Sequence, residues 1–154
     1  MRKRLAAALL FAAIASAQKY KGPRPEKTDV PYLLHADSLV ETEAAEAKEE
    51  ARKDDKVYRV SGASSPVKTP LAGPIFILKT DKLEPSRLEL YKLQSTGGGR
   101  EIVFSKKKQP RRIRLAVSRL EEGLFRLEVE ESLENGEYSL TPAESNQVFC
   151  FQVY

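Results

Sequence analysis

The sequence is short of the residues on which many active sites depend, with one cysteine, one histidine and no tryptophan in 154 residues. A single cysteine, Cys150, excludes a disulfide within the chain, so a folded domain must depend on its core. His35 is the single histidine. A zinc-type site needs three or four ligands from His, Cys and carboxylate groups, and here only carboxylates would remain to complete it. We therefore expect no metal site and no cofactor.

Motifs of enzymatic catalysis are also missing. No serine lies in a G-x-S-x-G turn, and Gly97-Gly98-Gly99 lacks the Lys-Ser/Thr pair of a phosphate loop. We expect these glycines to form a hairpin turn. Cys150 lies in the apolar run VFCF, which favours a buried thiol that acts as a small hydrophobic group over a nucleophile. A disulfide to another chain is the alternative for this lone cysteine. Catalysis, for example by a small hydrolase with paired carboxylates, is the least favoured function.

The sequence has only one long apolar run, at its beginning. Leu5 to Ala15 is uninterrupted, three basic residues precede it, and Ala15-Ser16-Ala17 follows it. This order is typical of a cleaved secretory signal, and the run is shorter than the roughly 17–25 residues that cross a bilayer. We predict a signal peptide over 1–17, no transmembrane span, and export to the periplasm or beyond, in a bacterial host.

The excess of positive charge comes mostly from this signal. The chain has 26 Lys and Arg against 22 Asp and Glu, and three of the bases but none of the acids precede residue 18. Without the signal, the net charge falls from +4 to +1. Proteins that bind nucleic acid normally carry a clearly basic domain. We therefore do not expect a nucleic-acid partner.

The first part of the exported chain differs from the rest in composition. Residues 18–31 are polar and contain three prolines, which predicts a flexible lead. Residues 32–56 are rich in Glu and Ala, which are strong helix formers, and Ser38 with Glu41 fits a capping box. We expect 32–56 to be a helical extension, with a short helix from about Leu39 to Asp54.

Residues 57–154 have the pattern of a β domain. Short runs rich in β-branched and aromatic residues alternate with turn signals every 8–12 residues or so. Clean alternation of apolar and charged residues predicts strands with one face in the core. It occurs at Ile113, Leu115 and Val117, and again at Phe125, Leu127 and Val129. The fold class we expect is mainly β, an antiparallel sandwich of about seven or eight strands with one N-terminal helix.

Two local features refine this expectation. The segment LENGEY places Leu133, Gly136 and Tyr138 in an order that resembles the tyrosine corner of immunoglobulin-like sandwiches, in which the tyrosine hydroxyl bonds backbone a few residues upstream. The two alternating runs predict an antiparallel hairpin that turns near Glu121. In the register we expect, Arg114 lies opposite Glu128 and Arg112 opposite Glu130.

One stretch stands out as a candidate contact site. The segment KKKQPRRIR is strongly basic, and acids crowd the region from Glu121 to Glu137. The stretch could bind an anionic partner, such as lipid phosphates or an acidic protein, or it could be a solvated loop whose arginines pair with those acids. No aromatic residue interleaves it, which argues against single-stranded nucleic acid. The candidate contact residues are Lys106, Lys107, Lys108, Arg111 and Arg112, with Arg114 just beyond.

These observations favour a non-catalytic binding module of the cell envelope, with an unidentified protein or an anionic envelope surface as its partner. The alternative is a carrier of a small ligand or lipid, with an apolar cavity between the sheets. A filled core with an exposed apolar patch would favour the binding module, and an internal cavity would favour the carrier.

Overall fold

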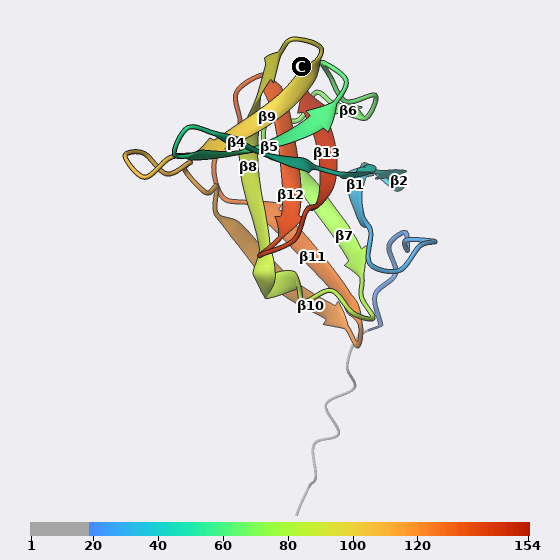
Figure 1. Cartoon of the computed structure of the whole chain (residues 1–154). Coiled ribbons are helices and arrows are strands. Elements are labelled where there is room, and N and C mark those ends of the chain that lie inside the picture. Colours follow the sequence, from blue (N-terminus) through green and yellow to red (C-terminus); the bar gives the residue numbers. More distant parts are fainter. Residues whose placement is uncertain (1–18) are drawn as a thin grey trace, which may run out of the picture.

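Two β-sheets make up the computed structural model, which describes residues 19–154 (Figure 1). The signal expected over 1–17 lies outside the described residues. The smaller sheet has five strands in the order β10-β11-β7-β1-β2, and all of its pairs are antiparallel. Its strands are β1 (Pro31–His35), β2 (Ser38–Glu41), β7 (Ile75–Lys79), β10 (Leu115–Glu121) and β11 (Leu124–Val129).

The larger sheet has eight strands in the order β3-β13-β12-β8-β9-β5-β4, with the short β6 parallel to β13. A single 3-10 turn, η1 (Pro85–Arg87), precedes β8, and residues 19–154 contain no α-helix. The mainly β, sandwich-like fold expected from the sequence is confirmed. The strands are β3 (Glu43–Glu46), β4 (Lys48–Arg52), β5 (Asp55–Ser61), β6 (Lys68–Thr69), β8 (Leu88–Thr96), β9 (Gly99–Phe104), β12 (Gly136–Pro142) and β13 (Gln147–Val153).

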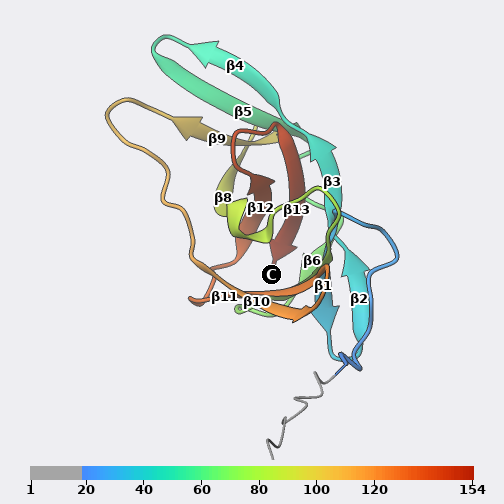
Figure 2. The same ribbon diagram turned by 90° about the horizontal axis from the view of Figure 1, so that it is seen from below.

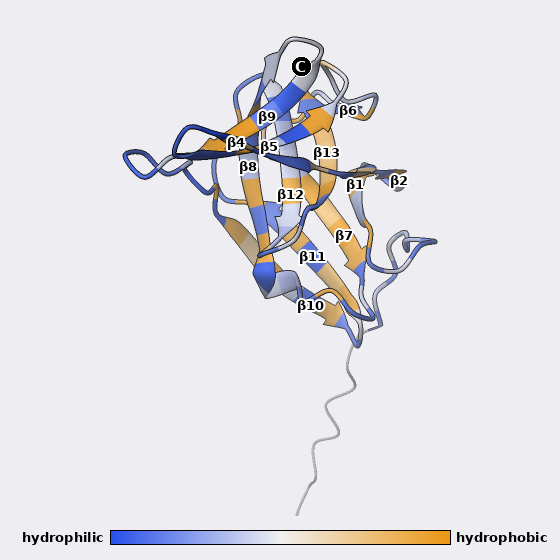
Figure 3. Ribbon diagram, in the orientation of Figure 1, coloured by the Kyte–Doolittle hydropathy of each residue, from blue (hydrophilic) through white to orange (hydrophobic). Residues whose placement is uncertain are grey.

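The main core fills the space between the two sheets. Apolar side chains from β7 and β11 meet others from β8, β12 and β13. Figure 3 shows β7, β11 and β13 largely in hydrophobic colours, whereas β8 alternates between hydrophobic and hydrophilic residues. Seven of the side chains are fully buried, at 0% exposure: Phe76, Leu78, Leu90, Leu127, Leu140, Phe149 and Phe151. The apolar run VFCF predicted a central strand, and β13 is one, since it pairs with β12 on one side and with β3 and β6 on the other.

The larger sheet rolls up, because its two edge strands are consecutive in the chain. β3 and β4 lie at opposite ends of the strand order but are separated only by Ala47. Ala47 is buried, and its N–H donates to the carbonyl of Asn146 at 2.8 Å. The face of this sheet turned away from the smaller sheet, here the inner face, therefore closes on itself. It holds a second apolar group, the inner cluster, formed by Ala47, Val60, Leu93, Val148 and Cys150.

The helix expected over 39–54 is wrong, and so is the boundary placed at residue 57. This segment forms β2, β3 and β4, which pair with β1, β13 and β5 respectively. Helix propensities differ by only a few tenths of a kcal/mol per residue and yield to tertiary pairing. Ser38 does not cap a helix, because it faces His35 across the two-residue turn of the β1–β2 hairpin. Residues 32–56 are therefore part of both sheets rather than an extension.

The hairpin expected from the two alternating runs is present as β10 and β11, but in a different register. Ala116, not Arg114, lies opposite Glu128, because the chain turns at Glu122 and Gly123, where Glu121 pairs with Leu124, rather than at Glu121 itself. An irregularity between Arg119 and Glu121 shifts the pairing by one residue. Arg114 instead lies beside Glu130, with 3.3 Å between its Nε and the carboxylate. Val117, expected in the core, is 41% exposed, since β10 is an edge strand that extends beyond the facing sheet.

Two predicted turn features are confirmed. Gly97 and Gly98 form the two-residue turn between β8 and β9, with φ of 54° and 78°. Positive φ at both positions is the geometry of the hairpin turn that glycine favours. The hydroxyl of Tyr138 donates to the carbonyl of Glu134 at 2.8 Å. This is the contact of a tyrosine corner, and it orders the segment that enters β12.

The lead that the sequence predicted to be flexible is irregular up to Val30 but is tied to the sheets. Arg24 pairs with Glu121 at the end of β10, and Lys27 pairs with Glu41 of β2 at 2.7 Å. Asp29 accepts hydrogen bonds of 2.9–3.1 Å from the backbone N–H groups of residues 81, 82 and 83. These contacts fix the start of β1 against the loop that follows β7.

Candidate functional site

The basic stretch forms the loop between β9 and β10, which stands away from the strands in two views (Figures 1 and 2). Its arginines are engaged with acids of the same chain. Arg111 binds Glu131 through two hydrogen bonds of 2.7 and 3.0 Å, and Arg112 lies 3.4 Å from Glu89 of β8, not opposite Glu130 as expected. These pairs attach the second half of the loop to the body of the protein.

The three lysines differ from the arginines. Lys106, Lys107 and Lys108 are all exposed, and no ion pair joins them to any acid in the part of the chain that the structure describes. The loop curls through its own contacts, because the amide of Gln109 donates to the carbonyl of Ser105 at 2.8 Å. Three consecutive lysines with no ion-pair partner among residues 19–154 therefore lie on a loop that is anchored at both ends.

A second polar cluster lies at one end of the inner face and was missed by the sequence reasoning. Arg100 of β9 is fully buried, and it binds Glu43 of β3 through contacts of 2.6 and 3.1 Å. It also donates to the carbonyls of Ser61 and Gly62 at 2.7 and 2.8 Å. Glu137 of β12 lies 3.9 Å from Arg100. A buried arginine needs this many acceptors, because an unpaired buried charge is costly.

Glu137 is the less satisfied of the two carboxyl groups. Its one hydrogen bond comes from the backbone N–H of Ser65 at 2.5 Å, and Arg100 is committed to Glu43. Burial raises the pKa of Glu137 above its usual value, although Ser65 and Arg100 act in the opposite direction. The site holds one guanidinium and two carboxylates, and all its contacts join strands or loops of the same chain.

Cys150 lies beside this cluster, directly opposite Glu43 in the β3–β13 pair. Its side chain is fully buried, and burial raises the pKa of its thiol to about 12. A thiol that stays protonated is neither a nucleophile nor a metal ligand. The sequence-based interpretation of Cys150 as a buried, small hydrophobic residue agrees with this position.

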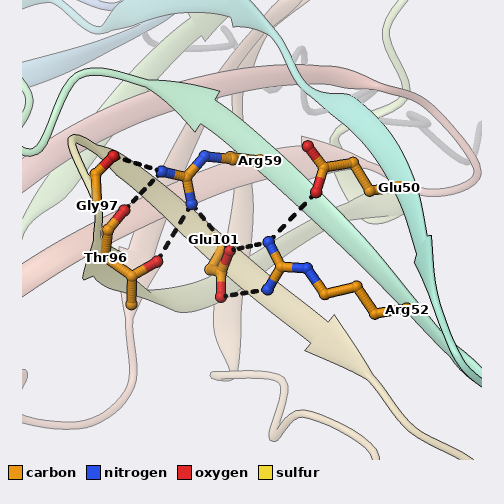
Figure 4. A network of polar contacts seen from close by, with 6 residues as sticks. All are labelled: Glu50, Arg52, Arg59, Thr96, Gly97 and Glu101. Atoms are coloured by element: carbon orange, nitrogen blue, oxygen red, sulfur yellow. Dashed lines mark hydrogen bonds and ion pairs between the residues drawn. The ribbon is translucent and has the colours of Figure 1, made fainter.

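A third cluster covers the outer side of β4, β5 and β9 (Figure 4). The carboxylate of Glu101 accepts two hydrogen bonds of 3.1 Å from Arg52 and one of 3.0 Å from Arg59. Arg59 also reaches the turn between β8 and β9, where it donates to the carbonyls of Thr96 and Gly97. Hydrogen bonds from Arg52 are the main reason that the pKa of Glu101 is lowered. Each charged side chain of this cluster has a partner within the chain, so the cluster links neighbouring strands rather than offering free groups to a ligand.

Among residues 19–154, His35 gains no partner for catalysis or metal binding. It ends β1 at a hairpin turn, and its Nε2 is buried without a hydrogen-bond partner. Asp29, which is near it in sequence, is occupied by backbone N–H groups. Within residues 19–154, no group of three or more His, Cys, Asp or Glu side chains is arranged to hold a metal ion.

A groove of about 730 Å³ lies at the open end of the rolled sheet, between β4 and β5 on one side and the β12–β13 turn on the other. Its aromatic residues are Tyr58, Tyr91 and Phe104, from three neighbouring strands. The alternation of side chains along β5, β8 and β9 is a sequence signal that could have predicted which face of its strand carries each ring. That these faces meet in a groove depends on the closure of the sheet at Ala47.

The part of the chain that the structure describes, residues 19–154, has no helix of the length and apolarity needed to pass through a bilayer. Comparison with known proteins adds no relative from which a role could be inferred. No protein-family model matches the chain, and neither a curated protein nor a solved structure matches it.

Proposed function

We propose that this protein is an exported, non-catalytic binding module of the bacterial cell envelope, and that its loop between β9 and β10 contacts an anionic surface. The observation that carries the proposal is the set of three exposed, unpaired lysines, Lys106, Lys107 and Lys108, on an anchored loop. Lysine ammonium groups are hydrated point charges that suit phosphate groups. Arg111 and Arg112, already paired with acids, position the loop.

The carrier alternative, with an apolar cavity between the sheets, receives less support. The space between the sheets is occupied by aromatic and aliphatic side chains with no exposed surface, among them Phe76, Phe149 and Phe151. Phe76 and Phe151 contact each other edge to face, with ring centres 5.2 Å apart. Interiors packed in this way leave few voids larger than a water molecule.

The test of the lysine contact is binding to vesicles that contain phosphatidylglycerol, compared with vesicles of phosphatidylcholine alone. Replacement of Lys106, Lys107 and Lys108 by serine should abolish most binding, because each lysine near an anionic surface contributes about 1 kcal/mol. A matched variant replaces three dispersed exposed lysines, Lys21, Lys48 and Lys79, and should keep most of the affinity. Equal loss in both variants would indicate a general charge effect and contradict the proposal.

Export is tested separately, on the protein isolated from its host. We expect a chain that begins at Gln18 and is recovered outside the cytoplasm, because signal peptidase cleaves after a small-x-small sequence such as Ala15-Ser16-Ala17. N-terminal sequencing and cell fractionation measure both properties. A cytoplasmic protein that begins at Met1 would contradict the envelope role, whatever the vesicle experiment shows.

A further inference from the structure

The groove at the open end of the rolled sheet has the composition of a ligand site. It measures about 730 Å³, and three buried apolar residues of the inner cluster, Val60, Leu93 and Val148, form part of its lining. Small-molecule sites commonly have volumes of about 300–1,000 Å³ and apolar linings with a few polar groups. This groove is separate from the basic loop, and the inference drawn from it does not depend on the proposed function.

The aromatic rings of the groove form one connected group. Phe104 lies between the other two, with ring centres 5.6 Å from Tyr58 and 5.8 Å from Tyr91, and both contacts are edge to face. All three rings keep part of their surface exposed. Ala47, between β3 and β4, also lines the groove with its short side chain. The rings are therefore held in place by one another while they remain accessible.

The charges that line the groove are mostly negative. Glu49, Glu89 and Glu144 lie along it, and Lys56 is the one base among its lining residues. Lys56 is already paired with Glu49, 3.3 Å away. Arg112 and Arg87 reach two of these acids from outside the groove, Glu89 at 3.4 Å and Glu144 at 3.6 Å. Each of the three acids thus has a basic partner, but two of these partners lie outside the lining, so acids outnumber bases three to one among the lining residues themselves.

Tyr91 connects the aromatic and the acidic features. Its hydroxyl donates a hydrogen bond to the carboxylate of Glu89, two residues earlier on β8. Burial, together with this bond, raises the pKa of Tyr91 to about 12, so the hydroxyl remains a donor at neutral pH. The bond holds the carboxylate of Glu89 beside the aromatic group.

We propose that this groove binds an amphipathic cation, that is, an ammonium group carried on an apolar body. The faces of tyrosine and phenylalanine rings attract cations through their quadrupole, most strongly when water is displaced. The carboxylates of Glu49 and Glu89 add a negative field at the rim, and the inner cluster accepts the apolar body. An anionic amphiphile would be repelled by the same acids, and a neutral one would gain nothing from them.

The test is an NMR titration of the protein, as isolated from its host, with benzyltrimethylammonium, neopentylbenzene and 3-phenylpropionate. These probes are similar in size and are cationic, neutral and anionic, respectively. We expect saturable shifts of the Tyr58, Tyr91 and Phe104 signals with the cation, weaker ones with the neutral probe and none with the anion. The affinity for the cation should decrease as ionic strength rises.

Two variants with a matched control make the test specific. Glu89→Gln should weaken binding of the cation about fivefold through loss of one nearby charge, and Tyr91→Leu should weaken it about three- to thirtyfold. The control is Glu131→Gln, which removes an acid that is paired with an arginine but lies outside the groove, and it should bind normally. Replacement of Lys106, Lys107 and Lys108 should also leave this affinity unchanged.

Several results would overturn the proposal. Equal affinity for the cationic and neutral probes would show that the groove does not recognise charge. Preferential binding of the anion would show that the groove prefers negative rather than positive ligands. Shifts confined to residues outside the groove would place the ligand elsewhere. Because Tyr91→Leu could disturb packing, Glu89→Gln is the deciding variant, and its failure to weaken binding of the cation in a folded protein would also overturn the proposal.

Discussion

Glu137 shows how a single buried residue can make stability depend on pH. Its carboxyl group lies at the end of the inner face, beside an arginine that is bound to another acid. Burial raises its pKa in the folded protein. The protonated form is therefore the one that folding favours. Compared with a carboxyl whose pKa does not change on folding, Glu137 stabilises the fold at pH values below its pKa in the unfolded chain. This contribution is lost as the pH rises through its pKa in the folded protein.

The substitution Glu137→Gln tests this sign. Glutamine keeps an oxygen that can accept the hydrogen bond from Ser65, but it does not titrate. We expect the stability of the original protein, relative to the variant, to decrease as pH rises from about 4 to 7. Urea unfolding at several pH values measures this difference. A difference that increases with pH would mean that the carboxylate, not the acid, is the form preferred in the fold.

At the scale of elements, Asp29 is one of the side chains that tie the lead before β1 to the sheets. Asp29 accepts hydrogen bonds from three successive N–H groups after β7, and its own N–H donates to the carbonyl of Lys79 at 2.7 Å. Although burial opposes it, these bonds from Asp81, Leu83 and Lys82 lower the pKa of Asp29. Its contribution to stability is present above the unfolded pKa and is lost as pH falls through the folded pKa.

We expect Asp29→Asn to lower the free energy of unfolding by about 1–3 kcal/mol at neutral pH, the usual loss for hydrogen bonds to a charged group. Asparagine is chosen because it tolerates the positive φ of 63° at this position. The effect should shrink in acid. Glu26→Ala, an exposed residue of the same lead, is the control and should change stability by no more than about 0.5 kcal/mol. Equal effects of the two substitutions on the free energy of unfolding would show that Asp29 does not anchor the lead.

At the scale of the whole molecule, β13 joins the two halves of the fold. Phe149 and Phe151 enter the core between the sheets, while Val148 and Cys150 enter the inner cluster on the opposite face. Neither apolar group can open without disturbing the strand that both share. We therefore expect the sandwich and the rolled part of the larger sheet to unfold in one cooperative transition.

Cys150 offers a direct probe of that cooperativity. Its thiol is fully buried, with a pKa raised to about 12, so we expect no reaction with a disulfide reagent such as Ellman's reagent until the chain unfolds. Thiol reactivity and far-ultraviolet circular dichroism, followed in increasing urea, should give coincident transitions. Reaction at urea concentrations where the spectrum is still native would show that the inner cluster opens independently.

The sequence by itself determined the features that arise from neighbouring residues. Alternating apolar residues marked β11 and the buried Leu127 and Val129, and adjacent glycines marked the turn at Gly97 and Gly98. The run around Cys150 indicated a central strand with a buried thiol. Each of these patterns spans only a few consecutive residues. Over such short segments, the period of the apolar side chains and the backbone preferences of the residues determine the local structure.

Tertiary structure alone decided where distant strands meet. A segment rich in Glu and Ala became β2, β3 and β4, because three other strands supply its hydrogen-bond partners and outweigh small helix preferences. The same closure buried Arg100 beside Glu43, gathered three rings into the groove, and left Lys106–Lys108 outside the ion pairs that hold the arginines. These positions depend on pairings between residues that are far apart in sequence. The free energy of such a pairing cannot be inferred from the pattern of residues within one segment.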